Sequence, residues 1–142
     1  MKVNVRKIER CTERIMNMLG INGYVNNIEF RTEKSGMYGY MQKEHGGYNV
    51  VIYVNECKNE KEIIHTIAHE LRHVWQHKNN TEFDTSMEYN KRPHEVDAHA
   101  FTNHFFSNIN NLSRLVAQGF NPILEKKQLK ESIRDFGFKG CM

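Results

Sequence analysis

The sequence predicts a single α+β domain in which a small three-stranded antiparallel sheet packs against helices. Three observations predict this class. The 142 residues suit one hydrophobic core, because two cores of half that size would each be marginally stable. Segments with apolar residues every three or four positions flank short segments rich in Val, Ile and Tyr. The resulting order, one helix, three strands and three further helices, is typical of helices grouped on one face of a sheet. We treat residues 1–142 as one domain.

The first helix is expected over 3–19. Its apolar residues recur at steps of three and four, which is the period of an amphipathic helix, and they are Val5, Ile8, Cys11, Ile15, Met16 and Leu19. Gly20 follows them and is expected to end the helix.

Three strands are expected over 27–32, 37–42 and 48–54. Turn residues separate them at Lys34-Ser35-Gly36 and at His45-Gly46-Gly47. Because both connections are short, the strands are predicted to form an antiparallel meander.

The second helix is expected over 60–78, because Asn59 with Glu62 three positions later is an N-cap signature. A polar stretch, 79–92, then leads to Pro93, which suits the first turn of a third helix. An apolar stripe marks that helix and consists of Val96, Ala100, Phe101, Phe105, Ile109 and Leu112. A last short helix is expected over 122–136.

Composition excludes several classes of protein. A net charge of +3 without a basic stripe indicates no nucleic-acid partner. No segment resembles a secretory signal or a membrane span. Three cysteines at unrelated spacings, without a CxxC pair, favour a reduced, cytoplasmic protein. The oligomeric state is not predicted by the sequence.

The second predicted helix contains an HExxH motif at His69, Glu70 and His73. Two imidazoles four residues apart lie on one face of a helix, from which both can bind one metal ion. Glu70 is expected to point toward a water bound by that metal, which is the position of a general base. A solvated stripe of histidines is the alternative interpretation. The opposite face of the helix is apolar and consists of Ile64, Ile67, Leu71, Val74 and Trp75.

A catalytic metal needs a third protein ligand, so that water can hold the fourth position. His77 would only extend the row of histidines along the same helix, and we expect it at the surface. We favour Glu95, in the first turn of the next helix, as the third ligand. Its rivals from the same helix are His94, Asp97 and His99. Zinc is the preferred ion for two His and one Glu, although manganese or cobalt binds similar ligands.

These residues carry a family resemblance. HExxH on a helix after a strand, followed by Glu95 in an ExxAxxF setting, resembles the compact zinc metallopeptidases of the ImmA/IrrE type and, more broadly, the gluzincins. The resemblance covers about residues 48–106. It implies a minimal zincin-like metallopeptidase domain in which His69, His73 and Glu95 bind zinc and Glu70 activates water. It also implies a peptide or protein substrate, such as a cytoplasmic regulator, and a phage or mobile-element origin.

The expected reaction is therefore hydrolysis of a peptide bond by a zinc-bound water, with Glu70 moving the proton. Tyr89, Arg92 and His94 are candidate donors to the oxyanion. The third strand, if it lies at the sheet edge, is expected to pair with an extended substrate. Two alternatives stay open. One is a binding module that keeps this fold and grips a partner protein, although such a module has no need of Glu70. The other is a zinc hydrolase of a different amide or ester.

Overall fold

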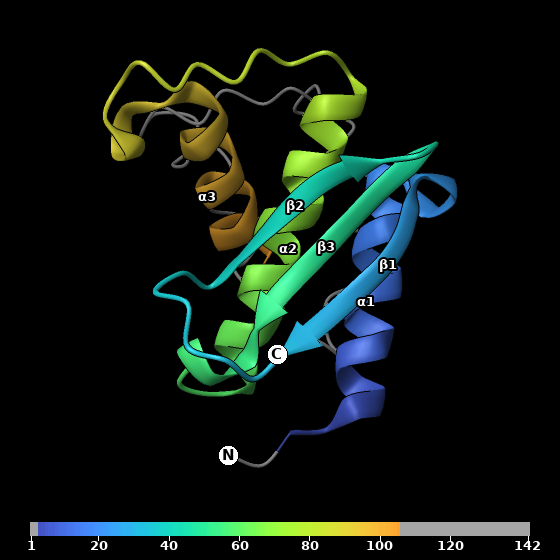
Figure 1. The fold of residues 1–142 in the computed structure, drawn as a ribbon. Helices are drawn as coiled ribbons and strands as arrows, with labels where there is room; N and C mark the ends of the chain where they lie inside the picture. The colour runs from blue at the N-terminus through green and yellow to red at the C-terminus, as the bar shows by residue number, and fades with distance from the viewer. Residues whose placement is uncertain (1–2, 106–142) are drawn as a thin grey trace.

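The computed structural model describes residues 3–105, with side chains to residue 103, and it confirms the α+β class (Figure 1). The elements are α1 (Val5–Leu19), β1 (Val25–Arg31), β2 (Gly39–Glu44), β3 (Gly47–Tyr53), α2 (Glu60–Lys78) and α3 (Pro93–Phe105). The expected helix over 122–136 and the end of the apolar stripe at Ile109 and Leu112 lie outside the described residues.

The sheet corrects the predicted meander. Its strand order is β1-β3-β2, with β2 antiparallel to β3 but β1 parallel to β3. The predicted hairpin between β2 and β3 is confirmed, and its two-residue turn places Gly46 at a φ of 72°. The prediction of a hairpin between β1 and β2 was wrong, and so was the prediction that the third strand lies at an edge. β2 and β1 are the two edge strands.

Burial explains why β3 occupies the centre of the sheet. Six of its seven residues are buried, whereas β1 and β2 contain none. A nearly continuous apolar strand is best covered when it has a neighbour on each side. The chain between β1 and β2 therefore crosses the end of β3, where the Lys34 ammonium donates to the Asn55 carbonyl (3.1 Å) and the Tyr53 N–H donates to the Tyr38 carbonyl (2.8 Å).

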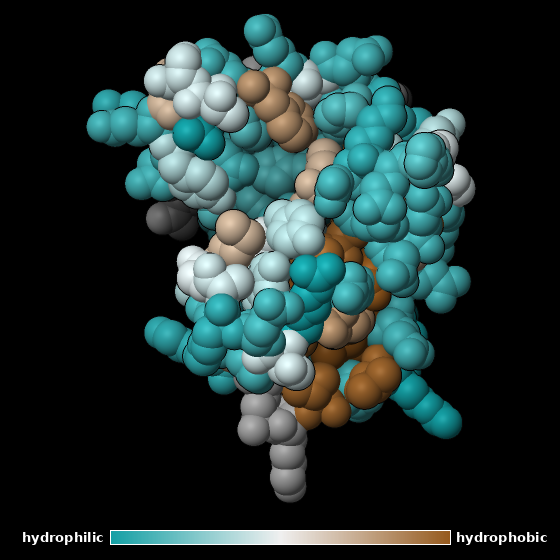
Figure 2. All heavy atoms as spheres, in the orientation of Figure 1, coloured by the Kyte–Doolittle hydropathy of each residue, from teal (hydrophilic) through white to brown (hydrophobic). Residues whose placement is uncertain are grey.

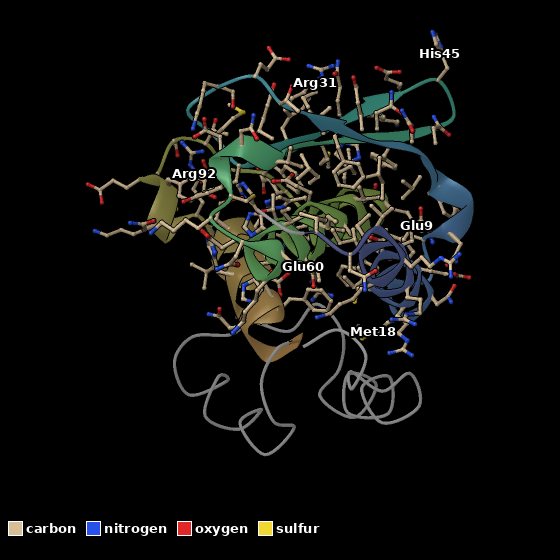
Figure 3. All side chains as sticks on the ribbon, turned by 90° about the horizontal axis from the view of Figure 1, so that it is seen from below. Glu9, Met18, Arg31, His45, Glu60 and Arg92 are labelled. Carbon is tan, nitrogen blue, oxygen red and sulfur yellow. The ribbon has the colours of Figure 1, made fainter. Side chains whose placement is uncertain are left out.

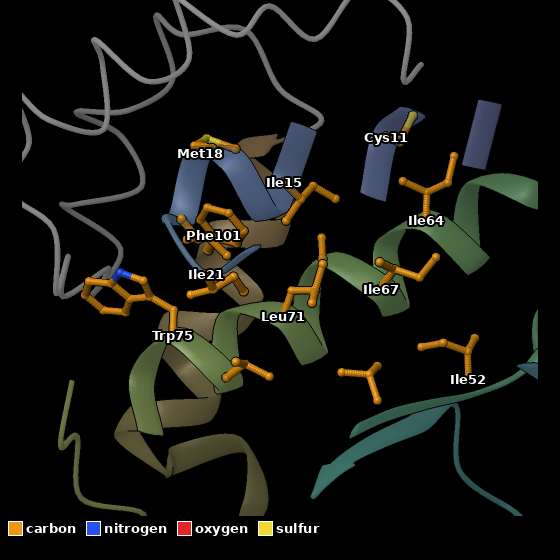
Figure 4. Close-up of a cluster of buried hydrophobic side chains, with 14 of the residues drawn as sticks. Cys11, Ile15, Met18, Ile21, Ile52, Ile64, Ile67, Leu71, Trp75 and Phe101 are labelled. Atoms are coloured by element: carbon orange, nitrogen blue, oxygen red, sulfur yellow. The ribbon is translucent and has the colours of Figure 1, made fainter. Parts of the chain in front are cut away.

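The helices form a second layer on one face of the sheet (Figure 3). α2 lies in the middle of this layer and contacts α1, α3, β2 and β3. Its apolar face meets α1 in a core where Ile15, Ile67, Leu71 and Phe101 are almost fully buried (Figure 4). Because this core fixes the rotation of α2, it also fixes the direction in which the opposite face of the helix points.

The boundaries of α2 agree with the prediction. The Asn59 side chain accepts the Glu62 N–H (2.9 Å), and the Glu62 carboxylate accepts the Lys58 N–H (2.9 Å). This reciprocal cap satisfies backbone donors that the first helical turn leaves unpaired. The expected start of α3 at Pro93 is also confirmed.

Most of the surface in Figure 2 is hydrophilic, but hydrophobic side chains gather in its lower part, near the N-terminal end of α1. A groove of about 800 Å³ between α1 and β1 is lined by Val5, Ile8 and Phe30, among others. Within residues 3–105, no helix combines the length and the apolar character needed to cross a bilayer.

Candidate metal centre

α2 brings the two histidines of the HExxH motif together. His69 and His73 lie one helical turn apart, and their Nε2 atoms are 3.0 Å from each other. Both side chains are buried, and their rings meet edge to face at a centroid distance of 4.6 Å. The two ring nitrogens therefore point at one small volume on the polar face of the helix.

Glu95 reaches the same volume from the first turn of α3. Its Oε1 lies 2.5 Å from His73 Nε2, and its Oε2 lies 3.5 Å from His69 Nε2. Oε2 is buried and has no hydrogen-bond donor among the described residues. In a tetrahedral zinc site with bonds of about 2.0–2.1 Å, neighbouring ligand atoms lie roughly 3.3 Å apart. The distances of 3.0 and 3.5 Å are close to this spacing, whereas the 2.5 Å between His73 Nε2 and Glu95 Oε1 would have to lengthen around a zinc ion.

The rivals of Glu95 occupy other places. His94 stacks on Phe83, with ring centroids 4.5 Å apart, and Asp97 is bound by Arg72. His99, one turn after Glu95, packs its ring 4.5 Å from that of His69. Its ligand atom lies within 4.8 Å of those of His69 and Glu95, so His99 is the rival that could also contribute to a metal site with these two residues.

His77 does not lie at the surface as expected. It is half-buried, and its Nδ1 is hydrogen-bonded to the Tyr48 hydroxyl (2.7 Å). Its side chain therefore ties the end of α2 to β3 and takes no part in the candidate centre.

Gln76 orients the second histidine, a role that the sequence did not reveal. His73 Nδ1 donates to Gln76 Oε1 (2.7 Å), while Gln76 Nε2 donates to the His94 carbonyl (2.8 Å) and to Asp97 Oδ2 (2.7 Å). The amide nitrogen of Gln76 already donates to two acceptors, so the amide oxygen is the atom that faces His73. This oxygen accepts the proton of Nδ1, and the lone pair of His73 therefore lies on Nε2. The spacing of three between His73 and Gln76 on a helix could have suggested this contact.

Arg72 anchors this arrangement from the core side. Its guanidinium donates to both oxygens of Asp97, from Nε (2.8 Å) and from NH2 (3.1 Å), and both side chains are almost completely buried. Arg72 also lies over the ring of Trp75, 4.3 Å from its centroid. A chain of contacts therefore runs from Arg72 through Asp97 and Gln76 to His73.

The electrostatics of the three ligand residues favour a cation between them. Burial raises the pKa of Glu95, but the neighbouring imidazoles of His69 and His73 and the Tyr89 hydroxyl outweigh this effect, so that the net pKa lies well below its usual range. Burial lowers the pKa of His69. Burial also lowers the pKa of His73, but the adjoining Glu95 carboxylate more than reverses this effect. A lone pair 2.5 Å from a carboxylate oxygen needs a proton or a metal ion between them.

Glu70 lies beside the ligands and is buried. Burial raises the pKa of its carboxyl to about 7. The charge of His73 lowers this pKa and the charge of Glu95 raises it, and both effects are smaller than that of burial. A carboxylate with this pKa can both take and return a proton at neutral pH, which is the property of a general base.

A cleft opens onto this group of residues. A pocket of about 600 Å³ and a second of about 250 Å³ adjoin each other, and they share Gly39, His69, Glu70 and Tyr89. β2 therefore forms one wall of the cleft, and the segment before α3 contributes Tyr89 to the other. This structure defines a class, an α+β domain with a His-His-Glu cluster and a buried carboxylate beside a cleft.

The chain belongs to the family described as "Protein of unknown function (DUF3920)", whose model matches residues 5–113. The match spans every described helix and strand. Comparisons with curated proteins and with solved structures found no match.

Proposed function

We propose that this protein is a zinc-dependent peptidase in which His69, His73 and Glu95 hold the metal ion. The observation that supports it most is the convergence, from two helices, of two imidazole nitrogens 3.0 Å apart and one carboxylate, whose oxygens lie 2.5 Å from His73 Nε2 and 3.5 Å from His69 Nε2. A zinc ion held there supplies an acidified water and a positive charge that polarises the substrate carbonyl. Glu70 takes the proton of the attacking water and delivers it to the leaving amide nitrogen.

We expect an extended substrate to pair with β2 and not with β3, the third strand. It is an edge strand, and Gly39 and Tyr40 line the pockets beside the histidines. An extended peptide that hydrogen-bonds to this edge passes directly in front of Glu70. The edge position therefore favours a peptide over a compact small molecule as the substrate.

Tyr89 is the best placed of the three candidate oxyanion donors. Its side chain lines both pockets, and its hydroxyl interacts with the Glu95 carboxylate at the candidate centre. The Arg92 guanidinium is instead held by the carbonyls of Thr85 and Met87 (3.2 and 3.0 Å), and His94 is buried against Phe83. We propose that the Tyr89 hydroxyl donates to the oxygen of the scissile carbonyl. Following the resemblance to ImmA/IrrE-type enzymes, the proposed substrate is a cytoplasmic regulatory protein.

Metal content tests this proposal most directly. We expect about one zinc per chain in protein purified without added metal, measured by elemental mass spectrometry, and loss of that zinc in His73→Ala and Glu95→Gln. Glu70→Gln is the matched variant, because it should keep the zinc and lose cleavage of a mixed peptide library. A wild-type protein that holds no zinc and cannot be loaded with it contradicts the proposal. Zinc without cleavage of any peptide would favour the binding module instead.

A further inference from the structure

The larger pocket of the cleft extends away from the candidate centre toward the N-terminal end of α2. Its walls come from β2 and the residues before it, from α2 and from α3, and they include Met37, Tyr38, Thr66 and Thr102. A volume of about 600 Å³ lies within the range of ligand-binding pockets and accommodates one long side chain together with water.

The charge of this pocket differs from that of the chain. The sequence has 20 Lys and Arg against 17 Asp and Glu, yet the described lining residues include two carboxylates, Glu62 and Glu70, and no Lys or Arg. Glu70 belongs to the candidate centre. Among the residues that the structure describes, Glu62 is therefore the charge that a substrate side chain meets at the far end of the pocket.

The spacing along α2 suits a long basic side chain. Thr66 lies four residues after Glu62, and His69 and Glu70 lie three and four residues after Thr66, so these residues share one face of the helix. Seven residues separate Glu62 from His69, which corresponds to roughly 10 Å along the axis. The stem of Lys or Arg carries its charge roughly 6 Å from the main chain, so a basic residue bound in the pocket between His69 and Glu62 can bring its charge to the Glu62 carboxylate.

The Glu62 carboxylate retains capacity for such a partner. Its Oε2 accepts the Lys58 N–H, which uses only one of about four acceptor positions on an ionised carboxylate. We infer that this pocket selects peptides with Lys or Arg close to the scissile bond and that Glu62 determines this specificity. This inference rests on the proposed peptidase function.

The test measures peptide binding separately from cleavage. Labelled peptides that differ only in one central residue, Lys, norleucine or Glu, are titrated into the full-length Glu70→Gln protein and followed by fluorescence anisotropy. We expect the Lys peptide to bind about tenfold more tightly than the norleucine peptide, which is the effect of one charge pair at the low end of measured couplings. The Glu peptide should bind most weakly.

Glu62→Gln isolates the charge, because glutamine can still accept the Lys58 N–H and keep the helix cap. In this variant the ratio of Lys to norleucine affinity should fall to about one. Glu60→Gln is the matched control, since Glu60 lies in the same first turn but binds the Asn4 N–H and Lys7 of α1 and does not line the pocket (labelled in Figure 3).

Equal binding of the Lys and norleucine peptides would overturn the inference, as would a Lys preference that survives in Glu62→Gln. Cleavage by the wild type separates this result from the proposed function. If the norleucine and Lys peptides are cleaved equally well, only the assignment of the pocket fails. If zinc is bound and neither peptide is cleaved, the peptidase proposal fails while the binding ratio still decides the role of Glu62.

Discussion

Gln76 connects three residues around the candidate centre. It accepts from His73 and donates to the His94 carbonyl and to Asp97, and its side chain is fully buried. Removing such a partner of a metal-bound imidazole usually lowers metal affinity by about 10–100-fold. We expect this loss in Gln76→Ala, measured by competition with a zinc chelator. Gln42→Ala on β2 serves as control, and equal affinities in the two variants would contradict the role of Gln76.

Arg72 and Asp97 form a buried ion pair that stability measurements can test. Arg72→Met leaves the Asp97 charge buried without its partner, which typically costs about 3–5 kcal/mol in the free energy of unfolding. Urea denaturation of the metal-free protein should show this loss. Adding Asp97→Asn removes the orphaned charge while an acceptor for Gln76 remains, so the double variant should recover part of the stability. Strictly additive losses would show that the two residues are not coupled.

Sequence spacing predicted the residues of the candidate centre that lie close together in the chain. The HExxH motif depends only on helical geometry, and Glu95 followed from the need for a ligand on another element. The partners Arg72 and Asp97 were not predicted as a pair, because they lie 25 positions apart and meet only when α2 packs on α3. Asp97 was considered as a metal ligand because the sequence shows its charge but does not show that Arg72 is its partner.

At the scale of elements, Gly39 determines how closely β2 approaches α2. A Cβ atom at this position would lie 2.6 Å from the Val51 carbonyl oxygen and 3.0 Å from Thr66 Cγ2, so the edge strand would have to move. We expect Gly39→Ala to lower the free energy of unfolding by about 1–3 kcal/mol, as overpacking usually does. Gly23→Ala is the matched control, because no atom lies within 4 Å of its Cβ position and its φ is not positive. Thermal unfolding of both variants measures the difference, and equal midpoints would argue against a close approach.

The elements themselves were more predictable than their arrangement. α2 was predicted at its observed bounds because its cap, periodicity and end are local signals. The strand order was not, because a turn signal such as Lys34-Ser35-Gly36 indicates a reversal of the chain without stating which neighbour the next strand pairs with. The nearly continuous apolar run of β3 indicated a central strand. Our prediction instead followed the short connection before β2, which favoured a hairpin between β1 and β2.

At the scale of the whole molecule, the candidate centre joins two helices that also meet through packing, the Arg72–Asp97 pair and the hydrogen bonds of Gln76. A ligand that binds only the folded state adds about 3–4 kcal/mol of stability at 100 to 1,000 times its dissociation constant. Zinc should therefore raise the unfolding temperature of metal-free protein in a concentration-dependent manner. Glu95→Gln should abolish most of this shift, and the same shift in that variant would place the bound zinc elsewhere on the chain.

The ion pair beneath the candidate centre also has an evolutionary consequence. Arg72 directly precedes the second histidine of the motif, and Asp97 lies two residues after Glu95. Each of the two positions is therefore close in sequence to a residue that the proposed metal binding requires. A substitution at either position alone leaves a buried charge, whereas a joint replacement by two neutral residues does not. Relatives of this chain should therefore exchange the two positions together, as a covarying pair, while His69, His73 and Glu95 stay the same.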